Sequence, residues 1–152
     1  MGENHTTKIE KPSFDALMDY IRRTENGKMN VMLEGGLRFA DEESKTVTWE
    51  FPIKEWELNS HGGLHGGIIA SMMDYGMGFW AQYFCDGGTV ATASLTVNYL
   101  KPFPADDTVI LTAQIVSAGR RIISATADAY IKSSGQMAAT ALATYARIPR
   151  VK

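Results

Sequence analysis

The chain has 152 residues, of which 45% are hydrophobic and 21% charged, and its formal net charge is -2 at pH 7. This length suits one domain that buries a core without disulfides, so we expect a single unit over residues 1–152. The weak acidic balance offers no basic surface for nucleic acid, which we exclude as a partner. The one cysteine, Cys85, and a polar N-terminus without an apolar signal segment predict a cytoplasmic location.

A short helix is predicted near the N-terminus. Ser13 suits the N-cap position, because a serine oxygen can accept from the free backbone N–H groups of a first helical turn. Apolar residues follow it at helical spacing. We therefore expect a helix at about 13–25, and the core of the domain at about 30–149.

Two strand patterns follow this helix. Residues 31–40 match a strand only weakly, since Gly35 and Gly36 interrupt the run. Residues 45–53 alternate between apolar and other side chains, which predicts a strand with one face buried. Such half-buried strands are typical of antiparallel sheets.

The centre of the chain, residues 66–84, is apolar along almost its whole length and follows a glycine-rich turn. This composition predicts a helix buried on every side rather than an amphipathic surface helix. Its length of about 28 Å approaches that of a membrane span, but Asp74 stands at its centre and no basic cluster flanks it, so we expect no span. A carboxylate there must be paired, hydrogen-bonded or functional, because burying it alone is costly.

Four more strands are predicted in the second half of the chain, at 89–101, 108–117, 121–132 and 136–148. The sequences between them have turn chemistry, so we expect hairpin connections. No helices alternate with these strands, which predicts an antiparallel sheet and the α+β class. A strongly curved sheet wrapped around the long central helix would accommodate both features.

One motif in the chain resembles a known family. It combines an asparagine, a histidine followed by two glycines, and an aspartate: Asn59-x5-His65-Gly66-Gly67-x6-Asp74. This spacing, the strand at 89–101 and the hairpin Gly119-Arg120-Arg121 resemble the hotdog-fold acyl-CoA thioesterases of the phenylacetate-pathway PaaI type, over about residues 58–148. The resemblance implies a hotdog fold and an acyl-CoA hydrolase without a cofactor beyond the coenzyme A of its substrate. It also implies homodimers that often pair into homotetramers.

The motif residues suit thioester hydrolysis on chemical grounds as well. The reaction needs a donor for the oxygen that gains negative charge, and a base that activates or orients water. The backbone N–H of Gly66, at the helix start, suits the first role, and the missing Cβ lets an acyl group approach closely. Asp74 suits the second role, as a general base or as a nucleophile.

Further site residues are expected around these two. By the same resemblance, Asn59 helps to hold the reacting groups and Thr92 offers a hydroxyl to the water. His65 steadies the loop or contacts the thioester. The residues that we assign to substrate binding are Gly67, Lys101, Arg120 and Arg121, the last three as partners of the coenzyme A phosphates.

The helix itself predicts where the site lies. Gly66 and Asp74 are eight residues apart, which is about 12 Å along a helix. One carbonyl group cannot touch both residues. We therefore expect an active site across a two-fold interface, to which one chain contributes Gly66 and the other contributes Asp74.

Two other functions fit the expected fold. A hydratase or dehydratase of acyl thioesters would share it, but the chain has no His-Phe-Pro-Gly stretch and no MaoC-like Asp-x-Asn-Pro-x-His loop. A non-catalytic acyl-CoA-binding module would normally carry an attached partner domain, which we do not expect here. No metal site is expected, because the glycines between His61 and His65 oppose the helix that a two-histidine site needs. The acyl group stays open.

Overall fold

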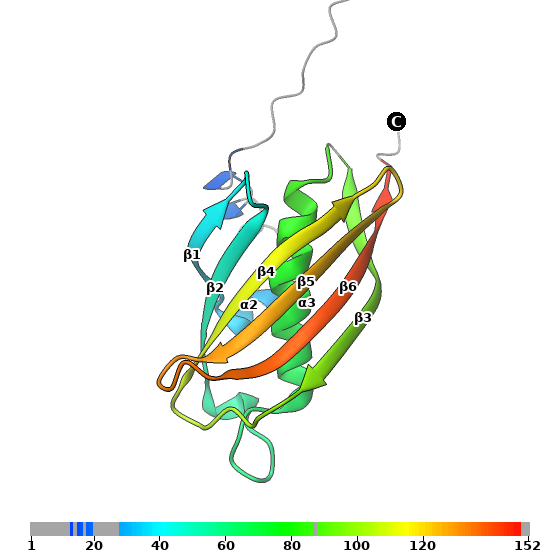
Figure 1. Ribbon diagram of the computed structural model, residues 1–152. Coiled ribbons are helices and arrows are strands. Elements are labelled where there is room, and N and C mark those ends of the chain that lie inside the picture. The colour runs from blue at the N-terminus through cyan, green and yellow to red at the C-terminus, as the bar shows by residue number, and fades with distance from the viewer. Residues whose placement is uncertain (1–12, 14, 17, 20–27, 87, 150–152) are drawn as a thin grey trace, which may run out of the picture.

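The structure is a computed structural model that describes residues 13, 15–16, 18–19, 28–86 and 88–149 (Figure 1). A long central helix, α3 (Gly66–Tyr83), lies against a curved six-stranded sheet. The strands are β1 (Gly36–Asp41), β2 (Thr46–Pro52), β3 (Thr89–Tyr99), β4 (Thr108–Ala118), β5 (Ile122–Ile131) and β6 (Met137–Ile148). All neighbouring strands are antiparallel, so the predicted α+β class and the central helix are confirmed.

The spatial order of the strands is β1-β2-β4-β5-β6-β3. Strands β4, β5 and β6 follow one another through hairpins, but β3 pairs with β6 at the far edge rather than with β4. Our expectation of a hairpin between β3 and β4 is therefore wrong. The segment 100–107 is long enough, at up to about 3.4 Å per residue, to cross three strand spacings of about 4.8 Å each. Turn chemistry alone does not reveal such a crossing.

The N-terminal part differs from expectation. A short helix, α2 (Met29–Leu33), occupies the beginning of the predicted strand 31–40, and β1 starts only at Gly36. The chain turns at Glu34, whose φ of 51° is left-handed, and Leu33 is completely buried. The tertiary contacts of Leu33 thus outweigh the local strand pattern. A 3-10 helix, η1 (Glu55–Glu57), was not expected either.

The predicted helix at about 13–25 falls mostly outside the described residues, Phe14, Leu17 and Ile21 among them. Residues 15–16 and 18–19 are helical. The Ser13 hydroxyl oxygen accepts a hydrogen bond from the Ala16 N–H at 3.2 Å, as an N-cap does.

The core lies between the concave face of the sheet and α3. Alternate residues of β2, β4, β5 and β6 face the helix and are buried. The helix lies close to the sheet at Gly76, where an added Cβ would lie 2.6 Å from a Leu111 methyl group and 3.0 Å from the Trp49 ring. The Trp49 Nε1–H donates to the Gly76 carbonyl oxygen at 3.3 Å, so the indole finds a partner in the core.

One stripe of α3 is not covered within the chain. Gly67 is exposed, and Ser71, Asp74 and Gly78, which follow it at helical spacing, are partly exposed. The prediction of a helix buried on every side is therefore wrong for the single chain. The stripe lies beside β3, which is the last strand of the sheet and is itself exposed or half-exposed along its whole length.

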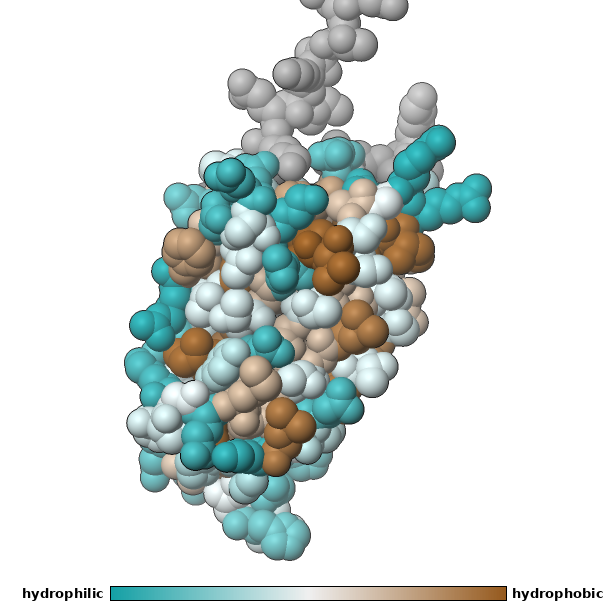
Figure 2. Space-filling model, viewed as in Figure 1, coloured by the Kyte–Doolittle hydropathy of each residue, from teal (hydrophilic) through white to brown (hydrophobic). Residues whose placement is uncertain are grey.

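The outer face of the sheet is mostly polar, and Figure 2 shows hydrophobic residues scattered among hydrophilic ones there. Hydroxyl groups pair across neighbouring strands, Thr48 with Thr112 at 3.1 Å and Ser94 with Thr144 at 2.6 Å. A polar outer face and an apolar inner face are typical of an antiparallel sheet that packs on one side. Within the described ranges, no helix is long and apolar enough to cross a membrane.

Candidate active site

The turn before α3 is held by Asn59. Its side-chain oxygen accepts hydrogen bonds from the backbone N–H groups of His61 at 2.9 Å and Gly63 at 3.2 Å. The two backbones also pair, since the Asn59 N–H donates to the Gly63 carbonyl at 2.7 Å. Asn59 therefore shapes the turn that leads into the helix, and it does so through the oxygen of its amide.

His65 caps the helix. Its Nδ1 accepts from the Gly67 N–H at 2.9 Å, while its own N–H donates to the Glu57 carbonyl at 2.9 Å. The side chain thus satisfies one of the backbone donors that every helix start leaves free. The sequence left two roles open for His65, steadying the loop or contacting the thioester. The structure shows contacts of the first kind. Gly67, which we expected at the substrate, has its N–H occupied by this hydrogen bond.

Gly66 is the first residue of α3, and the hydrogen bonding of its N–H differs from that of the Gly67 N–H. Among the described residues, no acceptor lies within hydrogen-bond distance of its N–H. Its carbonyl oxygen accepts from the Tyr99 hydroxyl at 2.8 Å, so β3 holds the first turn of the helix from outside. A free backbone donor at a helix start, where the helix dipole is positive, can bind an oxygen that carries negative charge.

An ion pair with a buried carboxylate supports the base of the turn, and sequence reasoning missed it. The Glu57 side chain is completely buried, and one of its oxygens accepts from the Lys54 N–H at 2.9 Å. The other lies 3.6 Å from the Lys54 ammonium. The bond from the Lys54 N–H to the Glu57 carboxylate corresponds to one half of a capping box, and the Glu57 N–H donates to the Lys54 backbone carbonyl at 3.0 Å instead of to a side chain. Because the backbone carbonyl of Glu57 accepts from the His65 N–H, fixing Glu57 also positions the start of α3.

Asp74 lies about two helical turns after Gly66 along α3. Its Oδ1 accepts from the Thr92 hydroxyl of β3 at 2.9 Å and from the Tyr145 hydroxyl of β6 at 3.1 Å. Within the described part of the chain, no donor lies within hydrogen-bond distance of Oδ2, and the residue is partly exposed. The carboxylate is therefore held by one oxygen and can offer the other to a water or a substrate. Thr92 was a predicted neighbour of the reacting water, whereas Tyr145 was not predicted.

A bulge in β3 explains how one strand contacts both ends of the site. Thr92 and Tyr99 are seven residues apart, so a regular strand would point them to opposite faces. The pairing of β3 with β6 shifts between Thr92 and Ser94, and beyond the shift Leu95 and Val97 pack on the core. The extra residue reverses the alternation, so that Thr92 reaches Asp74 and Tyr99 reaches Gly66.

The three predicted phosphate-binding residues do not come together within one chain. Lys101 follows the end of β3, whereas the exposed Arg120 and Arg121 form the hairpin between β4 and β5. The Arg121 carbonyl accepts from the Arg147 N–H, and Arg147 pairs with Val90 at the beginning of β3. The length of β3 therefore separates Lys101 from the two arginines, about 30 Å for a strand of this size.

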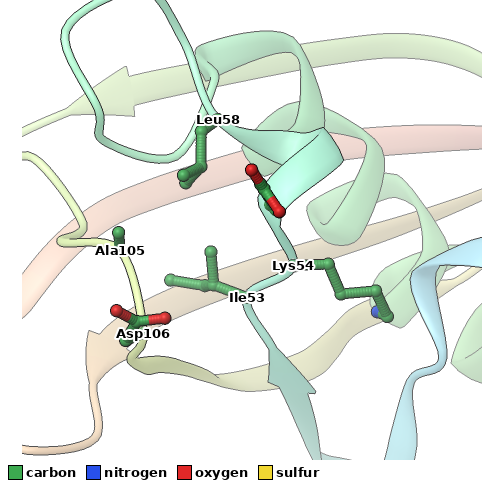
Figure 3. A pocket seen from close by; sticks show the side chains of 6 residues that line it. Ile53, Lys54, Leu58, Ala105 and Asp106 are labelled. Atoms are coloured by element: carbon green, nitrogen blue, oxygen red, sulfur yellow. The ribbon is translucent and has the colours of Figure 1, made fainter.

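Two hollows in the surface lie away from Asp74. One, of about 240 Å³, is lined by Ile53, Lys54, Glu55, Leu58, Ala105 and Asp106 (Figure 3). The other, of about 620 Å³, lies between the Asn59 turn and the segments around Phe103 and Ser133. Gly66, Asp74 and Thr92 line neither of them. In the described ranges, no group of three or more histidine, cysteine or acidic side chains could hold a metal ion.

Comparisons with known proteins identify the family. The family model "Thioesterase superfamily" matches residues 61–138, just over half of the chain. Acyl-coenzyme A thioesterase THEM4 of Xenopus laevis is 42% identical over 62 residues, which are 40% of this chain and 27% of that protein. The chain therefore spans only about a quarter of this curated relative.

Solved structures support the fold. The Escherichia coli PaaI protein of the phenylacetic acid degradation operon matches with a TM-score of 0.74 and 20% identity, over 87% of this chain and 92% of that one. The smu.793 protein of Streptococcus mutans, solved with bound acetyl-CoA, matches with a TM-score of 0.69 and 22% identity, over 78% and 92%. At these identities the likeness establishes the fold alone, and the hotdog fold expected from the sequence is confirmed. With a matching family model over its central helix and the strands that follow, the chain belongs to the thioesterase superfamily.

Proposed function

We propose that the protein hydrolyses an acyl-CoA thioester to the free acid and coenzyme A. The observation that carries this proposal is the half-exposed Asp74 carboxylate, held at Oδ1 and open at Oδ2, on the same helix as the free Gly66 N–H. Asp74 would activate the water and Gly66 would bind the developing oxyanion. The bound acetyl-CoA of the Streptococcus mutans neighbour supports an acyl-CoA as the substrate class.

The site would be completed by a second copy of the chain. Gly66 and Asp74 are eight residues apart on α3, about 12 Å, so one copy alone cannot bring both to one carbonyl. Strand β3 is an edge strand that pairs only with β6 among the described residues, and it contacts Asp74 near its beginning and Gly66 at its end. If two β3 strands pair antiparallel about a two-fold axis, Asp74 of one chain comes beside Gly66 of the other.

The same antiparallel pairing of two β3 strands would bring the separated positive charges together. The end of β3, with Lys101, would lie beside the beginning of the other chain's β3, near that chain's Arg120 and Arg121. Three positive charges would then flank each site, which suits the phosphates of coenzyme A. A homodimer is thus part of the proposal. Assembly into a tetramer and a cytoplasmic location stay predictions.

A panel of acyl-CoA esters tests the proposed activity. Release of free thiol from one or more of them is the expected result, and the preferred ester also identifies the acyl group. Hydration or dehydration of an enoyl or hydroxyacyl-CoA without thiol release would indicate the hydratase class instead. Tight acyl-CoA binding without any turnover would indicate a binding module.

Replacing Gly66 by alanine should lower kcat by about tenfold or more, because a methyl group crowds the approach of the thioester to the N–H. The fold should survive, since the new Cβ would lie in ordinary contact with the Tyr99 ring, at 3.4 Å. Steady-state kinetics beside circular dichroism measure both. Gly36→Ala is a matched control, because its Cβ would meet only the Glu50 carbonyl oxygen, at 3.7 Å. Wild-type kcat in a folded Gly66→Ala protein would mean that a group other than the Gly66 N–H binds the oxyanion.

Replacing Arg120 and Arg121 together by alanine should raise KM for acyl-CoA and leave kcat unchanged. The reason is that the guanidinium groups would bind phosphates far from the reacting carbonyl, and binding should also become less sensitive to salt. A pantetheine thioester, which lacks the nucleotide phosphates, should show no change in KM. Arg38→Ala, at the other edge of the sheet, is the control for loss of a positive charge. Equal KM changes with both substrates would mean that the arginines act through structure.

A further inference from the structure

A buried tyrosine touches the proposed base from inside the core. Tyr145, in β6, is only 1% exposed, yet its hydroxyl lies 3.1 Å from Asp74 Oδ1 and 3.2 Å from the Asp74 carbonyl oxygen. We propose that Tyr145 is the positioning residue that orients the Asp74 carboxylate so that Oδ2 faces the reacting water. This inference rests on the proposed hydrolase function.

Two donors reach the same oxygen because of the strand register. Thr92 and Tyr145 are directly paired residues of β3 and β6, immediately before the bulge. Side chains of such a pair lie about 5 Å apart on one face, so both hydroxyls can converge on one acceptor. Oδ1 is therefore held from two strands. Rotation of the carboxylate about its Cβ–Cγ bond would break both contacts, which fixes the direction of Oδ2.

The helix leaves room for the tyrosine. Gly78 lies one turn beyond Asp74 on the same stripe of α3. A Cβ at this position would lie 3.3 Å from Tyr145 Cε1 and 3.6 Å from the hydroxyl oxygen. A side chain at position 78 would thus push the ring away by a few tenths of an ångström. The glycine allows the ring to pass close to the helix and reach the carboxylate.

The tyrosine can donate to Asp74 but does not exchange protons with it. Burial, and then the negative charge and hydrogen bond of Asp74, raise the pKa of the Tyr145 hydroxyl above its usual value. The hydroxyl therefore stays protonated around neutral pH. A group that always keeps its proton can orient its neighbour, whereas it cannot act as the base. Its role is thus separate from that of Asp74.

A double-mutant cycle with Asp74 tests this role. Tyr145→Phe removes only the hydroxyl, and we expect kcat to fall about tenfold with KM changed less than about twofold, as for the loss of one hydrogen bond to a charged group. In the Asp74→Asn background the same change should alter the residual kcat less than about twofold, because no base remains to be oriented. Tyr130→Phe, which removes a hydroxyl from the outer face of neighbouring β5, should behave like the wild type.

Gly78→Ala provides a second, independent variant that keeps the tyrosine. By displacing the ring it should lower kcat in the wild-type background and have no effect in the Asp74→Asn background. If Tyr145→Phe fails to fold, this variant decides the question.

The outcomes separate the inference from the proposed function. An unchanged kcat in Asp74→Asn itself would overturn Asp74 as the base, and the inference with it. A large loss in Asp74→Asn with a normal kcat in folded Tyr145→Phe would overturn only the role of Tyr145. Equal losses from Tyr145→Phe in both backgrounds would show that the hydroxyl stabilises the core rather than the carboxylate, and would also overturn it.

Discussion

Asp74→Asn is expected to lower kcat by at least about a hundredfold while KM stays nearly unchanged, because general-base help is lost and the substrate contacts remain. In the structure, this substitution should remove the base while keeping the hydrogen bonds that hold the side chain. Both donors, Thr92 and Tyr145, contact Oδ1, and an asparagine can keep its own oxygen there. Its amide nitrogen then replaces Oδ2, the atom that would face the water, and an amide cannot accept the proton.

Thiol-release kinetics with the preferred acyl-CoA, beside a circular dichroism spectrum, measure the effect of this change. Asp128→Asn is the matched control, because Asp128 lies on β5 with its side chain on the outer face of the sheet. That variant should keep the kcat of the wild type. If Asp74→Asn also kept it, the carboxylate would have no part in the chemistry.

Two inactive variants are expected to rescue one another when their chains are mixed. Asn59→Ala removes the acceptor that holds the turn before Gly66, and Asp74→Asn removes the base. If each site takes the Gly66 turn from one chain and Asp74 from the other, each homodimer has both sites damaged. A mixed dimer has one site with both defects and one intact site. Random mixing should make about half of the dimers mixed, so about a quarter of wild-type activity per chain should return.

The experiment is to denature and refold the two variants together and to compare them with each variant refolded alone. Differently tagged chains confirm that mixed dimers form. Gly66→Ala can replace Asn59→Ala if the latter fails to refold, because it damages the same half of the site. Mixed dimers without recovered activity would mean that the site is built within one chain, and that Gly66 and Asp74 do not act on the same carbonyl.

Position-by-position patterns in the sequence determined much of the fold. The apolar run of residues 66–84 predicted α3, which spans Gly66–Tyr83, and strict alternation at 45–53 predicted β2. These features are visible in the sequence because helical and strand periodicity relate residues a few positions apart. The motif from Asn59 to Asp74 was recognisable for the same reason, since its members lie within sixteen consecutive residues.

The sequence was less informative where distant segments decide the conformation. The weak strand at 31–40 begins as the helix α2, because Leu33 is buried in the core. Our expectation for the partner of β3 was also wrong. Turn chemistry at 102–107 does not reveal whether the chain returns beside the same strand or crosses the sheet. In both cases the deciding contacts join residues far apart in the chain.

The chemical details of the candidate site were decided by tertiary structure in the same way. The sequence alone indicated Asp74 and Gly66, but it did not indicate that Tyr145, 71 residues after Asp74, would hold the carboxylate. That contact depends on the place of β6 in the sheet, whereas the contacts of Thr92 with Asp74 and of Tyr99 with Gly66 depend on a bulge in β3 that turns both side chains to the same face. A bulge adds one residue to a ladder without a distinct composition, so alternation in the sequence cannot reveal it. The sequence therefore determined which groups could react, and the register of two distant strands decided how they are held.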